Sequence, residues 1–183
     1  MREMMGDFTI GNHLVLLVEL DGQPWIADVG FGDGSLEPFR LQPAAMTFGG
    51  YRLRLEALDE CWWRFHNHEF GGARSFDFAV APADPDLLAE KCRWLQSAPD
   101  SNFVLNAVVQ RFRGEEILQL RGRTLRQVTP AGVDTSLLHS ADEFVEVLAA
   151  DFGLDLPEAA TLWPRILARH EQVMAAQAET AQA

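Results

Sequence analysis

The sequence predicts an α+β protein with a β-rich first part, a helical connector and a smaller α+β part. Short runs of alternating apolar and polar residues, separated by turn residues, extend to about Phe78 and are typical of a small antiparallel barrel or sandwich. Helix formers bounded by prolines follow, with Pro99 beyond their end. Strand-like segments then precede two helical patterns, so a second part with both strands and helices follows the β-rich part.

The β-rich part begins with the stretch NHLVLLVELDGQPWIADVGFGDG, which predicts two strands joined by a turn at Asp21-Gly22. After a loop, residues 51–56 alternate between apolar and polar side chains, as a half-buried strand does. Leu58-Asp59-Glu60 predicts the next turn, and residues 61–65 form the returning strand.

The connector is the helical stretch within APADPDLLAEKCRWLQSAPDSNF. Three further segments predict strands: NFVLNAVVQRF, EEILQLRG and TLRQVTP. A capping box, with Ser140 at the N-cap and Glu143 three residues later, opens a helix that closes near Gly153. The last amphipathic helix is expected from about Pro157 to Gln177, followed by a frayed tail.

The composition excludes several classes of function. A formal net charge of −12 argues against a nucleic-acid partner, because phosphate binding needs clustered lysine and arginine. No apolar run is long enough to span a membrane, and the sequence MREMMGDFTIG is too polar for a signal peptide. Cys61 and Cys92 do not form a disulfide framework. We therefore expect an acidic protein of the reducing cytoplasm.

His13 and Asp28 are the first candidates for chemistry. If Asp21-Gly22 is a two-residue turn, paired positions sum to 43, and the two side chains become diagonal neighbours on one face of the hairpin. A carboxylate bonded to one imidazole nitrogen leaves the other nitrogen as a base. The alternative is a buried pair that satisfies only its own hydrogen bonds at the end of a sheet.

The glycine-rich segment from Gly30 to Gly34 follows a strand but does not open a helix, so it does not predict a dinucleotide site. It predicts either a loop whose N–H groups approach an anionic or acyl ligand, or a plain barrel corner. His66 and His68 form an H-x-H pair without a third ligand at metal spacing, so no metal site is expected. Neither cysteine has the electropositive setting of a nucleophile, and both are interpreted as packing residues.

The segment from His13 to Gly32 resembles the arylamine N-acetyltransferase family. In that family a histidine opens an apolar strand, and a turn leads to a W-[IL]-[AV]-D-V-G-F-G segment, here Trp25 to Gly32. Weaker similarity continues through residues 38–41, 101–103 and 152–154, and it covers the chain from about Asn12 to Leu156.

The resemblance implies a β-barrel domain over residues 1–82, a connector helix over 83–99 and an α/β lid over 100–183, as in the last two domains of a cysteine-proteinase-like fold. It implies a Cys-His-Asp triad that passes an acetyl group from acetyl-CoA to an arylamine or hydrazine, without a metal. His13 and Asp28 match the catalytic histidine and aspartate. Phe31 and Gly32 match the loop at the acetyl and CoA end of the pocket, and Phe103 matches an aromatic residue near its mouth.

The family's cysteine lies in an R-G-G-x-C-x-E segment well upstream of the histidine, whereas only twelve residues precede His13 here. We therefore expect the helical N-terminal domain and its nucleophile to be absent, and these residues to be inactive alone. Two alternatives stay open: a non-catalytic module that binds CoA or an aromatic ligand, and a relative that forms amides from polyketide chains. The uncovered apolar surface is expected to self-associate or to bind a partner chain.

Overall fold

The structure, a computed structural model, describes residues 11 and 13–182, so Asn12 at the start of the predicted hairpin lies outside it. It is a mixed α/β protein whose paired strands are all antiparallel. The chain divides into two compact units, Met1–Trp94 and Leu95–Ala183, and each is described separately. The predicted division at residues 82 and 99 stays a prediction.

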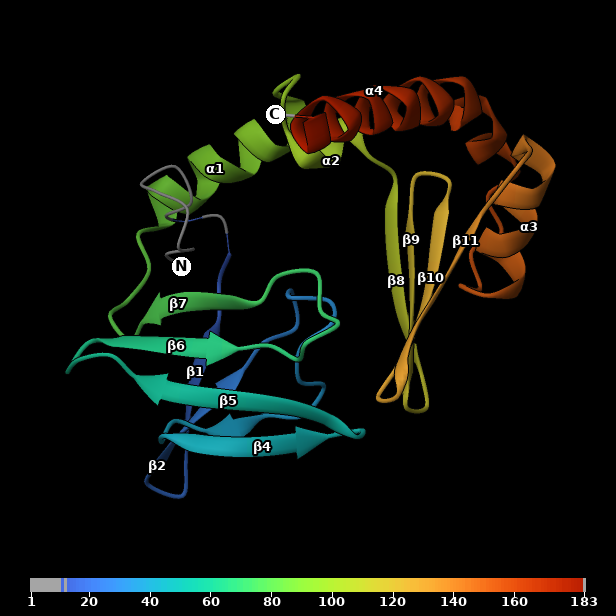
Figure 1. Cartoon of the computed structure of the whole chain (residues 1–183). Helices are drawn as coiled ribbons and strands as arrows, with labels where there is room; N and C mark the ends of the chain where they lie inside the picture. Colours follow the sequence, from blue (N-terminus) through green and yellow to red (C-terminus); the bar gives the residue numbers. More distant parts are fainter. Residues whose placement is uncertain (1–10, 12, 183) are drawn as a thin grey trace. The chain divides into compact units, whose positions relative to one another are not determined.

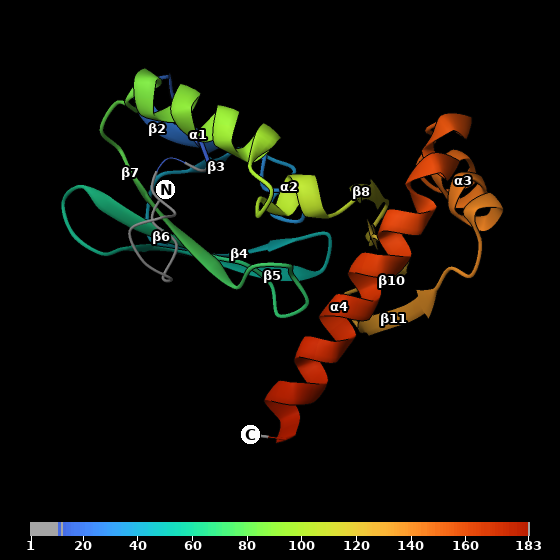
Figure 2. The ribbon, with the colours of Figure 1, turned by 90° about the horizontal axis from the view of Figure 1, so that it is seen from above.

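The first unit contains two sheets. A three-stranded sheet has the order β1-β2-β3, and a four-stranded sheet has the order β4-β5-β6-β7. In Figures 1 and 2 the smaller sheet lies behind the larger one and crosses its strands. The strands are β1 (Leu16–Leu20), β2 (Gln23–Ala27), β3 (Phe39–Arg40), β4 (Ala44–Phe48), β5 (Tyr51–Ala57), β6 (Trp62–His66) and β7 (Ser75–Ala79). The predicted closure of these strands into a barrel stays a prediction.

The core of the first unit comes from the alternation that the sequence shows. In β5, Tyr51, Leu53 and Leu55 are buried, whereas Arg52 and Arg54 between them are exposed. Successive side chains of a strand point to opposite faces, so one face of β5 packs inward. Leu53 and Leu55 belong to a buried cluster whose other members are Ile26, Phe65, Phe76 and Phe78.

The connector helix is α1 (Pro85–Ser97), as the proline-bounded pattern predicts. The boundary between the two units falls within this helix. None of the helices in the described residues is both long and apolar enough to cross a membrane.

The second unit contains one sheet of order β11-β10-β9-β8, with helices packed against it. Its strands are β8 (Val108–Arg113), β9 (Glu116–Arg121), β10 (Thr124–Thr129) and β11 (Gly132–Leu137). Its helical elements are α2 (Asn102–Leu105), α3 (Ala141–Ala150), the 3₁₀ turn η2 (Pro157–Leu162) and α4 (Trp163–Gln182). The core joins the sheet, through Leu118 and Leu120, to Phe144 of α3 and Trp163 of α4.

Three predictions for this unit need correction. The segment 102–112 was expected to be one strand, but its first four residues form α2, because Oγ of Ser101 accepts a hydrogen bond from N of Phe103 at 3.2 Å and caps a helical turn. The strand β11 was missed. The last helix begins as a 3₁₀ turn and continues as α4 to Gln182, through alanine, glutamine and glutamate residues that favour helices.

Candidate active site

The hairpin of β1 and β2 has the register that the sequence predicts. Leu20 pairs with Gln23 and Leu16 pairs with Ala27 across a two-residue turn. Asp21 and Gly22 both have positive φ values, 52° and 67°, as a type I′ turn requires. His13 lies just before β1 and Asp28 just after β2, so this turn brings the two side chains together.

The side chains of His13 and Asp28 are hydrogen-bonded. Nε2 of His13 lies 2.8 Å from Oδ2 and 3.0 Å from Oδ1 of Asp28, and the side chains are 13% and 8% exposed. Oδ1 also accepts hydrogen bonds from the backbone N of Gly30 at 3.0 Å and of Phe31 at 3.2 Å. An ionised carboxylate only accepts hydrogen bonds, so Nε2 carries the proton that it donates to Asp28.

The other ring nitrogen of His13, Nδ1, has no hydrogen-bond partner among the described residues. With Nε2 protonated, Nδ1 of the neutral ring presents a lone pair. A Cβ atom added to Gly30 would lie 3.0 Å from Cε1 and 3.5 Å from Nδ1 of the ring. Glycine at position 30 is therefore what lets the backbone pass so close to this imidazole.

Two phenylalanine rings hold the imidazole from other sides. The ring centroid of His13 lies 5.5 Å from that of Phe76 and 6.0 Å from that of Phe31, both in edge-on arrangements. A Cβ atom at Gly34 would lie 2.9 Å from Cδ1 of Phe31, so the loop needs glycine there to hold that ring. Phe76 was not among the predicted site residues, because its place in the strand segment 75–79 carries no signal beyond that of a strand.

His13 also lines a pocket of about 450 Å³ in the first unit. The rest of its wall is mainly apolar, with Leu14 and Leu17 on one side and Leu87 and Leu88 of α1 on another. Phe31 and Gly32 do not line this pocket. Phe103 belongs to the second unit, where its side chain is 69% exposed. Of the predicted site residues, the structure thus brings together His13, Asp28 and Phe31.

Comparison with known proteins decides the family. A family model described as N-acetyltransferase matches residues 2–161 of the chain. The chain belongs to the arylamine N-acetyltransferase family. No curated protein gives a significant match to the sequence.

Solved arylamine N-acetyltransferases have a similar fold. The enzyme from Salmonella typhimurium is 21% identical, with a TM-score of 0.71 over 84% of this chain. The Mycobacterium marinum enzyme in complex with CoA is 22% identical, with a TM-score of 0.71 over 85%. The Mycobacterium abscessus enzyme is 28% identical, with a TM-score of 0.70 over 84%. The matches cover 60%, 58% and 58% of those three chains, respectively.

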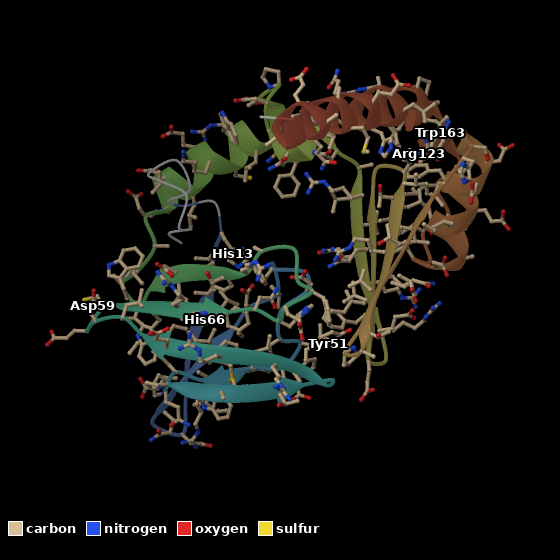
Figure 3. All side chains as sticks on the ribbon, in the orientation of Figure 1. His13, Tyr51, Asp59, His66, Arg123 and Trp163 are labelled. Carbon is tan, nitrogen blue, oxygen red and sulfur yellow. The ribbon has the colours of Figure 1, made fainter. Side chains whose placement is uncertain are left out.

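Neither cysteine of this arylamine N-acetyltransferase chain lines the pocket at His13. Cys61 is exposed in the turn between β5 and β6, where its backbone N donates to Oδ1 of Asp59 at 2.7 Å. Figure 3 shows Asp59 at the tip of this hairpin, well away from His13. Cys92 is exposed on α1. The interpretation of both cysteines as packing residues was wrong, because both side chains face solvent.

The H-x-H pair has two separate structural roles. Nε2 of His66 lies 2.8 Å from Oε2 of Glu56, and this hydrogen bond, with a second from Arg54, lowers the pKa of the Glu56 carboxyl. His68 is buried beside the ring of Tyr51, and its Nε2 lies 3.1 Å from the backbone O of Asp33. Within the described residues, no group of histidine, cysteine, aspartate or glutamate could hold a metal ion.

The buried carboxylate of Asp33 fixes the glycine loop of this family member. Its side chain accepts hydrogen bonds from Nδ2 of Asn67 at 3.0 Å and from the backbone N of Gly72 at 2.6 Å. Asp33 thereby ties the segment that carries Phe31 to the loop between β6 and β7. This role was not predicted; the only signal in the sequence is a single charged residue within a glycine-rich run.

Proposed function

We propose that this chain supplies the histidine and the aspartate of a Cys-His-Asp site that transfers acetyl groups from acetyl-CoA to arylamines or hydrazines. One observation carries the proposal: Asp28 fixes Nε2 of His13, while Nδ1 has no partner among the described residues and the ring lines an apolar pocket. This arrangement suits a general base better than a self-contained core pair, because a core pair explains neither the ring nitrogen without a described partner nor a pocket at the histidine.

In the proposed reaction, Nδ1 of His13 accepts the proton of a cysteine thiol. The thiolate attacks the acetyl carbonyl of acetyl-CoA, the carbon–sulfur bond to CoA breaks, and the CoA thiolate leaves with the proton from His13. The amine then attacks the acetyl-cysteine, loses a proton to His13 and leaves as the amide, and the cysteine thiol is regenerated. Asp28 stabilises the imidazolium that forms in both steps.

The nucleophile of this reaction is neither Cys61 nor Cys92, in our proposal. The pocket at His13 contains neither residue, so we infer that the thiol comes from protein outside these 183 residues. The 183 residues alone are then inactive, because a base without its nucleophile cannot form the acyl-enzyme.

Phe31 and Gly32, which do not line the 450 Å³ pocket, are proposed to border the acetyl group and CoA when these bind beside His13. The contact of Phe31 with the His13 ring and the CoA bound to the Mycobacterium marinum relative support this assignment. Gly32 has a φ of 89°, a conformation that favours glycine, and the residue is exposed. The assignment of Phe103 to the mouth of the site stays a prediction from the family resemblance. No metal takes part in the proposed reaction.

The direct test is an acetyl-transfer assay with acetyl-CoA and an aryl hydrazine. The chain Met1–Ala183 is expected to give no product above background. A longer protein, encoded with the DNA upstream of Met1 and containing an in-frame R-G-G-x-C segment, is expected to turn over. In that protein His13→Ala lowers kcat by about 10²–10⁴-fold, whereas His66→Ala does not. Turnover by the 183 residues that survives loss of both cysteines would contradict the proposal.

A second candidate function is a binding module without turnover, and the absence of a cysteine from the pocket favours it. Such a module would bind CoA or an aromatic amine to the 183 residues themselves. Calorimetry with each ligand separates the two functions. The binding module is favoured if His13→Ala leaves the affinity for the ligand unchanged and if no longer form of the protein turns over acetyl-CoA. The sequence and the pocket do not favour a polyketide acyl donor over acetyl-CoA.

We also propose that protein outside these residues covers β1. This strand is at the edge of its sheet, and its apolar side chains are 45–55% exposed. A strand edge with exposed apolar side chains tends to pair with further protein. Light scattering that shows only a monomer, with no apolar dye bound, would contradict this. A cytoplasmic location fits the proposed use of acetyl-CoA and the two thiols.

A further inference from the structure

The second unit contains a small pocket lined by positive charge. The pocket has a volume of about 110 Å³ and lies between the β9–β10 turn, residues 105–107 and α4. Four side chains that carry or can carry positive charge line it, and none of the lining residues is an aspartate or a glutamate. These four are Arg121, Arg123, Arg169 and His170. We refer to this group as the arginine pocket.

Local structure explains why these side chains meet. Gly122, with a φ of 57°, and Arg123 form a two-residue turn between the paired residues Arg121 and Thr124. On α4, Ile166 is buried against the sheet, and Arg169 and His170 follow it three and four positions later on the same helix face. Figures 1 and 2 show α4 passing over the end of the sheet where this turn lies, and Figure 3 labels Arg123 beneath the helix.

The three arginines of the pocket form no ion pair with any described residue, although the protein has 27 acidic residues. Elsewhere, Arg54, Arg64 and Arg113 each pair with a carboxylate at 2.6–2.8 Å. Arginines without an ion pair occur elsewhere among the described residues, as at Arg52 and Arg165, but here three of them line one pocket. The positive charge of this pocket is therefore open to an anionic ligand.

The hydrogen-bonding groups of the pocket are also incompletely used. Nε of Arg169 is buried and has no hydrogen-bond partner among the described residues, and Nη1 of the same residue is 3.4 Å from Oε1 of Gln172. Nε of Arg123 donates to the backbone O of Leu138 at 2.9 Å, which holds this guanidinium in place. A buried guanidinium N–H without an acceptor is costly, so a bound acceptor would stabilise the site.

We propose that the arginine pocket binds a phosphate group. Guanidinium groups bind oxyanions through paired N–H donors, and a tetrahedral dianion offers oxygens to donors that approach from several elements at once. A carboxylate has two oxygens in one plane and satisfies fewer of these donors. The volume suits a single phosphate group, either the free ion or the exposed phosphate of a larger molecule. This site belongs to the second unit alone and does not depend on the proposed acetyl transfer.

Titration with inorganic phosphate, followed by the NMR signal of the Arg169 Nε–H group at constant ionic strength, tests the proposal. We expect saturable binding that moves this signal, with a Kd in the millimolar range or tighter. Arg169→Gln and Arg121→Gln should each weaken binding at least about tenfold, the loss expected for one charge-assisted hydrogen bond. Arg121 is exposed, so its variant keeps the fold even if Arg169→Gln does not. Arg165→Gln, an exposed arginine of α4 outside the pocket, is the matched control and should bind normally.

Two further ligands define the chemical class. Glycerol 3-phosphate that binds more tightly than inorganic phosphate identifies the phosphate of a larger molecule as the ligand, and weaker binding identifies the free ion. Acetate should not compete at equal ionic strength. The proposal is overturned by the absence of phosphate binding, by equal binding of acetate, or by binding that Arg121→Gln and Arg165→Gln weaken to the same extent.

Discussion

Replacing Asp28 by asparagine separates the two tasks of this carboxylate. Oδ1 accepts hydrogen bonds from the backbone N of Gly30 and Phe31, whereas Oδ2 is the atom closest to Nε2 of His13, at 2.8 Å. Asparagine keeps one carbonyl oxygen, which we expect to stay on the two backbone N–H groups. Its Nδ2 then replaces Oδ2 opposite the imidazole.

An amide nitrogen only donates hydrogen bonds, so it requires Nε2 of His13 to become an acceptor. The proton then moves to Nδ1, the nitrogen that the proposed mechanism needs as a base. One charge-assisted hydrogen bond is lost, worth about 1.5–3 kcal/mol, and the neutral replacement recovers part of it. We therefore expect Asp28→Asn to lower the free energy of unfolding by about 1–2 kcal/mol.

Nitrogen NMR of the labelled imidazole reports which ring nitrogen carries the proton, and urea denaturation gives the stability. We expect the wild-type ring to be protonated at Nε2 and the Asp28→Asn ring at Nδ1. Asp28→Ala is the matched comparison, because it removes the loop acceptor as well and should cost more stability without imposing the Nδ1 form. If the His13 ring of the Asp28→Asn variant stays protonated at Nε2, the role of the Asp28 carboxylate in fixing this tautomer is refuted.

Three further substitutions test the surroundings of the site. Gly30→Ala places a methyl group 3.0 Å from Cε1 of His13, so it should displace the ring and cost about 1–3 kcal/mol in urea denaturation, whereas Val29→Ala, at a 92% exposed position, should cost little. Asp77→Ala removes the carboxylate that the Arg64 guanidinium contacts at 2.6 and 2.9 Å, and it should cost about 2–3 kcal/mol because the pair is partly buried; a loss below 1 kcal/mol would contradict this. The lowered pKa of Glu56 means that the folded state favours the ionised carboxylate. The ionised side chain therefore stabilises the fold at pH values above its usual pKa of 4.5, and this contribution is lost as the pH falls through the lower pKa of the folded state. Glu56→Gln should therefore be less stable than wild type at neutral pH, and the difference should shrink on acidification; a constant difference would argue against the shift.

The sequence predicts correctly what depends on neighbours along the chain. The type I′ turn at Asp21-Gly22 sets the register, and the register places His13 beside Asp28, so a single local signal predicted the pair. Likewise, N of Glu143 donates to Oγ of Ser140 at 3.1 Å, as the capping motif predicts. The wrong prediction of a strand at residues 102–105 also concerns a local signal. The N-cap at Ser101 favours a helical turn over the strand that the apolar pattern suggested.

What only the tertiary structure decides are the contacts between segments that are distant in sequence. Asp33 binds the loop that contains Asn67 and Gly72, and no periodicity or turn signal predicts that pairing. The arginine pocket joins a hairpin turn near residue 122 to a helix near residue 169, and only the structure shows that its arginines have no ion pair among the described residues. The physical reason is that propensity and alternation act over a few residues, whereas packing selects which of many equally polar side chains meet. The sequence thus determined the family and the His13–Asp28 pair, and the tertiary structure alone determined the surroundings that hold the pair and the charge pattern of the second unit.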